Sequence, residues 1–310
     1  MEAGVGAQRA PRGRRLGPQL SRPVALALLR DYITLTKPRI ISLLLVTTLA
    51  TMFVADPSGP ALSTILWTML GGYLAAGGSG AINHYIDRDR DARMARTATR
   101  PLVSGRIPPL HGLAFGITLG AAAFVQLWLT VNFLSAALAM GGLLGYVFIY
   151  TLWLKPLTPQ NIVIGGAAGA VPPLVGWASA TGGLTLDALW PFAIVFLWTP
   201  PHFWALSLLI KDDYARTGVP MLPVVRGEAE TRRQIVLYSV LLTVVTLLPV
   251  ATGLFGALYL VSAALLGAGF CALAMRLRRT PERSAALRLY LSSLAYLALL
   301  FVAMAADRVL

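Results

Sequence analysis

Five of the chain's 13 acidic residues lie in two short polar stretches, and these residues have the clearest chemical potential. Asp87, Asp89 and Asp91 lie in the first stretch, and Asp212 and Asp213 lie in the second. Carboxylates this close repel one another unless a cation lies among them, and hard divalent cations take oxygen ligands. Mg²⁺ suits so sparse a cluster, because it usually binds through one or two carboxylates plus substrate phosphates. The two stretches therefore predict a Mg²⁺ site.

Asn83 extends the first stretch into the preceding apolar run. Asn83, Asp87 and Asp91 are spaced i, i+4, i+8, so a helix that continues through them places all three on one face, whereas Asp89 points elsewhere. Carboxylate, Mg²⁺ and guanidinium groups together hold diphosphates in proteins, because the Arg fork matches phosphate oxygens. The alternative is a solvated surface on which Asp and Arg neutralise one another. The neighbouring basic residues are Arg88, Arg90, Arg93, Arg96 and Arg100 in the first stretch and Lys211, Arg216 and Arg226 in the second.

The composition indicates that membrane helices position these residues. Of the 310 residues, 56% are hydrophobic and 13% are charged, with a mean hydropathy of +0.69, whereas soluble domains have about a quarter charged. We therefore predict an all-α polytopic membrane protein with nine transmembrane helices. The single cysteine, Cys271, excludes an intrachain disulfide and a cysteine-based metal site. Apolar runs that approach the ~20 residues needed to cross a bilayer begin near Ile40, Ala61, Leu110, Phe133, Ile162, Ala188, Ile235, Ala257 and Ala285.

The distribution of Lys and Arg predicts the orientation in the membrane. All of the 26 basic residues except Arg308 lie before the first run or in alternate loops, and the opposite loops, such as 56–60 and 181–187, contain none. Basic loops stay in the cytoplasm, so we expect a cytoplasmic amino terminus, an external carboxyl terminus and both acidic stretches on the cytoplasmic side. The net charge of +13 is then a topology signal, and we expect no nucleic-acid partner. We expect residues 1–30 to form a disordered basic cytoplasmic tail, or alternatively a mitochondrial presequence, and residues 31–310 to form the transmembrane domain.

Five segments are specific enough to compare with known families: TKPRI at 36–40, NHYIDRDRDARMARTATRPLVSG at 83–105, LTPQNIVIGGAAGAVPPLVGW at 157–177, TPPHFWALS at 199–207 and KDDYARTGVPMLPV at 211–224. From about Leu35 to the last span, the chain resembles the membrane prenyltransferases of the UbiA superfamily. The first acidic motif is typical of the whole superfamily. The three later segments resemble its heme-modifying branch, the protoheme IX farnesyltransferases.

The resemblance implies nine helices around a central cavity that opens toward the cytoplasm. It also implies transfer of the farnesyl group of farnesyl diphosphate to the 2-vinyl group of heme B, with addition of water, to give heme O and diphosphate for the biogenesis of heme A and terminal oxidases. Mg²⁺ would be the cofactor and heme B a substrate. The implied partners are farnesyl diphosphate, heme B, the lipid bilayer, and a heme A synthase or cytochrome oxidase assembly proteins. The implied location is the bacterial cell (inner) membrane, or alternatively the mitochondrial inner membrane.

The family's pattern also implies roles for individual residues. Asn83, Asp87 and Asp91 match the first Mg²⁺–diphosphate motif, and Asp212 and Asp213 fall in the second. Lys155 is followed by Pro156 where the pattern has a second basic residue, which is a departure from the family. The basic positions expected at the diphosphate are Arg96 and Arg100, which match an RTxxRP element, together with Lys155 and Lys211.

Ionising an allylic diphosphate leaves a cation on the prenyl chain, and aromatic faces stabilise a cation by roughly 0.5–2 kcal/mol each. We expect Tyr150 and Trp204 to contact substrate, and an interfacial aromatic belt is the alternative. The aromatic residues near the cytoplasmic ends of the predicted spans that could take part are Tyr85, Tyr146, Tyr150, Phe203 and Trp204. His202 lies within the sixth predicted span, where a buried histidine indicates function. We expect His202 to be catalytic, as an axial ligand to heme iron or a proton-transfer group, with a structural hydrogen bond as the alternative.

Two other functions use a similar sequence pattern. A transporter would also have about nine spans and kinked, glycine-rich helices, but its polar residues would lie near mid-membrane. Here they collect at the cytoplasmic ends of the predicted spans. A relative that prenylates a quinone or chlorophyll precursor would carry out the same chemistry on another ring. Pro172 and Pro173 should kink the fifth span in either case.

Overall fold

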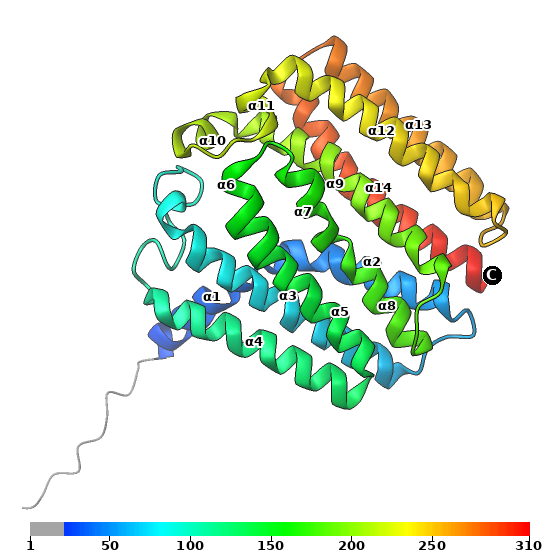
Figure 1. Cartoon of the computed structure of the whole chain (residues 1–310), viewed down its shortest axis with the longest axis horizontal. Helices are drawn as coiled ribbons and strands as arrows, with labels where there is room; N and C mark the ends of the chain where they lie inside the picture. The colour runs from blue at the N-terminus through cyan, green and yellow to red at the C-terminus, as the bar shows by residue number, and fades with distance from the viewer. Residues whose placement is uncertain (1–21) are drawn as a thin grey trace, which may run out of the picture.

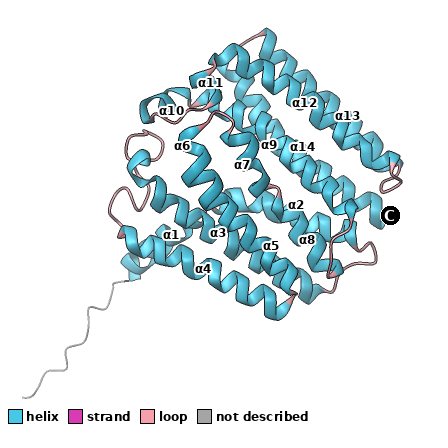
Figure 2. Cartoon of the chain, in the orientation of Figure 1, coloured by secondary structure: helices cyan, strands magenta, loops and turns pink. Residues whose placement is uncertain are grey.

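The structure is a computed structural model that describes residues 22–310. Within this range the chain folds into helices joined by loops and turns, and contains no strand (Figure 2). Most of the tail expected at 1–30 lies outside the described residues, and helical structure begins inside that range, because α1 occupies Arg22–Thr36.

Nine helical segments are long and apolar enough to cross a membrane within residues 22–310, as the apolar runs predict. Three further helices, α1, α10 (Lys211–Thr217) and α11 (Leu222–Val225), lie outside these spans. The spans are α2 (Pro38–Ala55), α3 (Leu62–Asp91), α4 (Pro109–Thr130), α5–η1–α6 (Phe133–Leu157), α7–α8 (Asn161–Thr181), η2–α9 (Leu186–Leu209), α12 (Gly227–Ala251), α13 (Ala257–Arg279) and α14 (Arg283–Val309).

The spans form a closed bundle (Figure 1). α2 packs against α3, α8 and α14; α14 also packs against α9; and α3 and α5 both pack against α4. α12 and α13 form an outer pair beside α9 and α14. The loop after α3 and helix α10 lie at one end of the bundle, and the carboxyl terminus lies at the other. The two acidic stretches therefore share one end, as the alternating loops predict.

Two spans depart from a regular α-helix. The fifth span breaks at Ala170 between α7 and α8, directly before Pro172 and Pro173. A proline has no amide hydrogen and its ring crowds the preceding turn, so the predicted kink is confirmed. The fourth span widens into a π-helix, η1 (Gly145–Leu154), and the amide of Lys155 bonds to the carbonyl of Tyr150, five residues earlier. Such widenings are frequent at functional sites.

Candidate active site

The last two turns of α3 carry a buried acidic stripe. α3 continues to Asp91, so Asn83, Asp87 and Asp91 share one face and are only 4%, 2% and 4% exposed. The side chain of Asp89 points away, is 81% exposed and contacts only Arg88 among the described residues. The i, i+4, i+8 spacing predicts this arrangement. The stripe is not a solvated surface, because such a surface would leave all three side chains in water.

Asp87 is the most heavily bonded carboxylate of the stripe. Its Oδ2 atom lies 2.5 Å from Nζ of Lys155 and accepts a hydrogen bond of 2.8 Å from Nδ2 of Asn83. Its Oδ1 atom accepts a bond of 3.2 Å from Arg90. Lys155 therefore reaches the acidic stripe although Pro156 follows it. The π-helix η1 ends at the residue before Lys155, and this helix and α3 are in contact.

Lys37 belongs to the same cluster, and the sequence analysis did not identify it. Its Nζ atom donates a hydrogen bond of 2.6 Å to Oδ1 of Asn83. Lys37 joins α1 to α2 with φ 59° and ψ 54°, and is the sole non-glycine residue between 22 and 310 with positive φ. This left-handed conformation is uncommon for a side-chain-bearing residue. The sequence feature that could have identified Lys37 is its place in the TKPRI segment, directly before Pro38, where a short helix ends and the first span begins.

The loop after α3 folds back on the stripe. Arg100 forms an ion pair with Asp91, and the Thr97 hydroxyl donates a hydrogen bond of 2.9 Å to the Asp91 carbonyl oxygen. Arg96 lies in the same loop but is exposed. The structure therefore brings Arg100 to the carboxylates and leaves Arg96 at the rim, where it is available to an incoming anion.

The two aspartates of the second acidic motif differ in their exposure to solvent. Asp213 is 8% exposed and pairs with Arg216, one turn later on α10. Asp212 is exposed. Lys211 lies 3.1 Å from Glu228, at the start of α12, and makes no other side-chain hydrogen bond in the described part of the chain. The expectation that Lys211 belongs to the diphosphate cluster is therefore not supported by its contacts, because a nearer carboxylate holds it.

The two acidic stretches meet through a small apolar cluster. Met94, from the loop after α3, packs with Tyr214 of α10 and with Ile162 of α7. Burial raises the pKa of the Tyr214 hydroxyl, while the nearby Arg96 acts to lower it and Asp87 to raise it. Tyr214 therefore lies near charges of the first stretch although it belongs to the second, and its packing with Met94 brings the two stretches together.

The cluster carries an excess of positive charge around its carboxylates. Burial and the neighbouring cations Arg100 and Lys155 together lower the pKa of Lys37 to about 7, although Asp87 and Asp91 act in the opposite direction. Asp87 and Asp91 therefore lie among four basic side chains, namely Arg90 of α3 itself and Lys37, Arg100 and Lys155 from three other segments. A group of this kind attracts an anion with several oxygens, such as a diphosphate.

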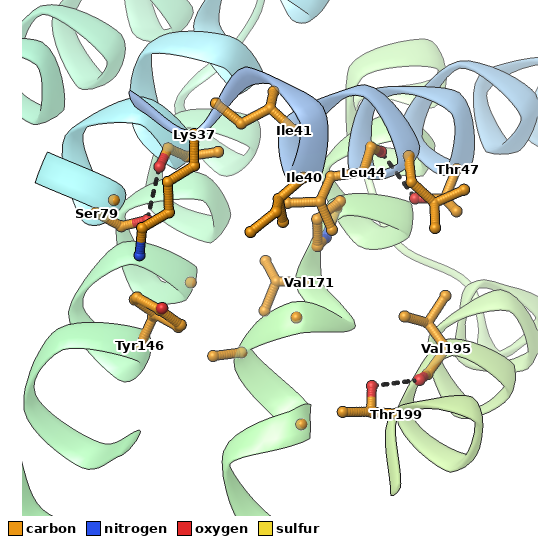
Figure 3. Close-up of a pocket in the computed structure, with 18 of the residues that line it drawn as sticks. Lys37, Ile40, Ile41, Leu44, Thr47, Ser79, Tyr146, Val171, Val195 and Thr199 are labelled. Carbon is orange, nitrogen blue, oxygen red and sulfur yellow. Dashed lines mark hydrogen bonds between the residues drawn. The ribbon is translucent and has the colours of Figure 1, made fainter. Parts of the chain in front are cut away.

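A cavity of about 650 Å³ adjoins the cluster, and Lys37 lines it. Lys37 and Tyr146 lie on one side of this cavity and Val195 and Thr199 on the other (Figure 3). Ile40, Ile41 and Leu44 form the α2 wall. The remaining wall comes from other residues of α2, including Arg39, from Thr36 of α1, and from α3, α5, η1, α7, α8, α9 and α14, and it is mostly apolar. An apolar chamber with a charged end suits a substrate that has a long hydrocarbon part and an anionic head.

Two of the three aromatic and histidine residues expected to contact substrate line the cavity, and the third does not. Tyr150 and His202 line the cavity, as does Tyr146, whose ring centroid lies 5.4 Å from that of Tyr150. Trp204 does not line it: this side chain is 1% exposed and packs edge-on against Tyr238 of α12 at 5.2 Å. Its neighbour Phe203 faces the cavity instead. Adjacent residues on a helix point about 100° apart, so only one of the pair can reach substrate.

The site has oxygen ligands suitable for Mg²⁺. Asp87, Asp91, Asp213 and the Asn83 amide oxygen are all of the hard type that Mg²⁺ prefers. In residues 22–310 no three His, Cys, Asp or Glu side chains lie close enough together to hold a metal by themselves. The arrangement therefore fits Mg²⁺ bound through one or two carboxylates and completed by phosphate oxygens and water.

Comparison with known proteins gives one consistent result. The pattern of the UbiA prenyltransferase family matches residues 44–302. A protein named protoheme IX farnesyltransferase from Symbiobacterium thermophilum is 53% identical over 280 residues, which cover 90% of this chain and 94% of that protein. A protein of the same name from Roseiflexus sp. (strain RS-1) is 57% identical over 283 residues, which cover 91% of this chain and 53% of the relative. The chain thus spans about half the length of several such relatives, including one from Thermus thermophilus.

Solved structures share the fold. A structure described for digeranylgeranylglyceryl phosphate synthase covers 91% of this chain and 99% of its own, with a TM-score of 0.72 and 17% identity. A UbiA homologue from Archaeoglobus fulgidus bound to DMAPP and Mg²⁺ covers 88% of this chain and 99% of its own, with a TM-score of 0.66 and 14% identity. At these identities, the likeness shows the fold alone.

Proposed function

The chain belongs to the UbiA prenyltransferase family, and we propose that it transfers the farnesyl group of farnesyl diphosphate to the 2-vinyl group of heme B. Addition of water completes the reaction and gives heme O and diphosphate. The observation that carries the proposal is the buried Asn83–Asp87–Asp91 stripe beside the apolar cavity, bonded to Lys37, Lys155 and Arg100. The relatives named protoheme IX farnesyltransferase, 47–57% identical to this chain, support heme B as the acceptor.

The cationic side chains bind the diphosphate in this proposal. Lys37, Lys155 and Arg100 are each bonded to a side chain of the stripe in the protein alone. They exchange those partners for phosphate oxygens when substrate enters, with Arg96 and Arg216 closing the rim. Asn83, Asp87, Asp91 and Asp213 are the residues that would hold Mg²⁺, with one or two carboxylates on each ion, and the metal would neutralise the negative charge that builds on the leaving diphosphate. Asp212 is exposed and lies at the edge of this set.

The cavity holds the organic parts of both substrates. The bond between the farnesyl C1 carbon and the diphosphate oxygen breaks, and its electron pair leaves with the diphosphate. The vinyl group supplies the electron pair for a new bond from its terminal carbon to C1, and a water oxygen adds to the inner vinyl carbon with loss of a proton. Tyr146 and Tyr150 line the cavity, where their rings stabilise the allylic cation and keep water from capturing it before the new bond forms.

The proposal includes a location. The nine spans indicate a membrane protein, and the relatives come from bacteria, so we place the enzyme in the bacterial cell membrane with its charged end facing the cytoplasm. The basic residues at that end support this orientation. A heme A synthase or cytochrome oxidase assembly proteins are the partners we propose, because their chemistry consumes heme O.

The test is product analysis. Membranes that contain the protein are incubated with heme B, farnesyl diphosphate and Mg²⁺, and heme O is measured by mass, with the Asp87→Asn variant as the matched control. We expect heme O from the wild type and on the order of 10²-fold less from the variant. A prenylated quinone or chlorophyll precursor in parallel incubations, with no heme O, would contradict the proposed acceptor. The transporter alternative is not favoured, because the charged residues of the site lie at one end of the bundle and not near mid-membrane.

A further inference from the structure

The side chain of His202 is held between α9 and α14 by ring stacking and by one hydrogen bond. Its imidazole ring stacks on Trp198 at a centroid distance of 4.3 Å and an angle of 20°, and on Tyr290 at 4.9 Å and 29°. Its Nδ1 atom lies 2.6 Å from the hydroxyl oxygen of Ser293. The ring is therefore fixed in its plane by two aromatic neighbours and in its rotation by one hydrogen bond.

The partners of Ser293 determine which ring nitrogen carries the hydrogen. The Ser293 hydroxyl has one hydrogen, and it donates this hydrogen over 2.6 Å to the carbonyl oxygen of Tyr290. Ser293 can then only accept from His202, so Nδ1 of His202 carries a hydrogen and Nε2 has a free lone pair. The Trp198 indole nitrogen donates over 2.8 Å to the carbonyl oxygen of Ser293, which keeps this residue in place.

One ring nitrogen of His202 is left free to bind a ligand in the substrate chamber. His202 lines the cavity, and its Nε2 atom has no hydrogen-bond partner among the described residues. The cavity wall contains no other imidazole, no thiol and no thioether in the described part of the chain. A histidine that binds a metal through one ring nitrogen usually donates its other N–H to a nearby acceptor, which fixes the tautomer and raises the basicity of the ligand. Ser293 is such an acceptor, because its hydroxyl oxygen accepts the Nδ1–H hydrogen of His202.

We propose that Ser293 is a positioning residue: it holds His202 as the Nδ1–H tautomer, so that the Nε2 lone pair binds the iron of the heme B substrate as an axial ligand. This inference rests on the proposed function, since it takes heme B as the substrate. The ligand fixes the height and tilt of the macrocycle in an otherwise apolar chamber. It thereby selects an iron porphyrin over a quinone precursor, which has no metal to bind.

The experiment is a heme titration that needs no farnesyl diphosphate. Purified protein is titrated with ferric and ferrous heme B, and the optical and resonance Raman spectra report the axial ligand. We expect the wild type to give an imidazole-ligated spectrum. We expect His202→Gly to lose it and to recover it with added imidazole. We expect Ser293→Ala to bind heme about 10- to 100-fold more weakly and to show a lower iron–histidine stretching frequency, and Ser293→Thr to restore both.

Ser239→Ala is the matched control. Ser239, on α12, is fully buried and donates its hydroxyl hydrogen to the carbonyl oxygen of Ile235, as Ser293 does to Tyr290, but it does not line the cavity. An unchanged iron–histidine frequency in Ser293→Ala, or the same loss in Ser239→Ala, would overturn the role of Ser293. An imidazole-ligated spectrum in His202→Gly without added imidazole would overturn the role of His202. In either case, heme O formed by the wild type would leave the proposed function standing, whereas absence of heme O would refute that function separately.

Discussion

Lys37 donates a hydrogen bond of 2.6 Å to Asn83, although 46 positions of sequence separate the two residues. This bond connects the junction of α1 and α2 with the acidic face of α3. It places a cation at the boundary between the charged cluster and the apolar cavity.

Replacing Lys37 with methionine should lower kcat/KM for farnesyl diphosphate by about 10- to 100-fold, because a hydrogen bond to a charged group contributes about 1.5–3 kcal/mol. The matched control is Lys211→Met, since Lys211 pairs with Glu228 at an exposed position. This control should stay within about threefold of the wild type. Steady-state heme O formation at equal expression measures both variants. Equal effects of the two substitutions would show that Lys37 has no special position.

The two acidic stretches should act as one site. Asp87→Asn and Asp213→Asn each remove a charge that matters most as the diphosphate leaves, so each should cost several kcal/mol of transition-state stabilisation, on the order of 10² to 10⁴ in rate. The double variant should be little slower than either single one, because residues that act as a unit are not additive. Turnover of the four proteins decides the matter. Near wild-type turnover in Asp213→Asn would mean that the second stretch is only a solvated surface.

Activity should depend on a divalent cation. The carboxylates of the site repel the diphosphate unless a metal lies between them, so excess chelator should abolish heme O formation and Mg²⁺ should restore it. Heme B binding should be unchanged under the same conditions, because the cavity around His202 contains no carboxylate. Full turnover in chelator would remove the metal from the reaction.

Close packing of α8 against α2 should make Gly176 intolerant of a side chain. A Cβ atom at Gly176 would lie 2.3 Å from the carbonyl oxygen of Thr48, which is backbone and cannot rotate away. Gly176→Ala should therefore destabilise the bundle by about 1–3 kcal/mol, the usual cost of overpacking. Gly141→Ala on α5 is the control, because a Cβ atom at Gly141 would have no neighbouring atom within 4 Å. Thermal unfolding in detergent compares the two, and equal midpoints would contradict the close approach.

Much of the fold follows from the sequence because bilayer-length apolar runs and alternating basic loops are strong signals. Those runs predict all nine spans within residues 22–310, with starts that match the structure within a few residues except at the seventh span, where α12 extends to Gly227 through polar residues. The spacing of Asn83, Asp87 and Asp91 predicts a shared helical face, because α3 continues without a break to Asp91.

The orientation of each helix about its axis and the contacts between distant segments could not be predicted, because no local sequence pattern specifies them. α9 is apolar on all sides, so no periodicity indicates that Phe203 faces the cavity and Trp204 faces α12. Lys37 bonds to Asn83 from a left-handed backbone conformation, which the residue types of the TKPRI segment do not indicate. The pairing of Lys211 with Glu228 bridges two helices, and only tertiary structure brings those side chains together.

The cavity is closed by helices from opposite ends of the described chain. α14 packs against both α2 and α9, and Tyr290, Leu294 and Leu297 complete the wall. During synthesis α2, α3 and α9 are translated before α14. The charged end of the site can therefore form while one side of the chamber is still exposed to lipid. Until α14 is inserted, the chamber lacks the wall that Tyr290, Leu294 and Leu297 provide, so we expect catalysis to begin only after insertion of α14.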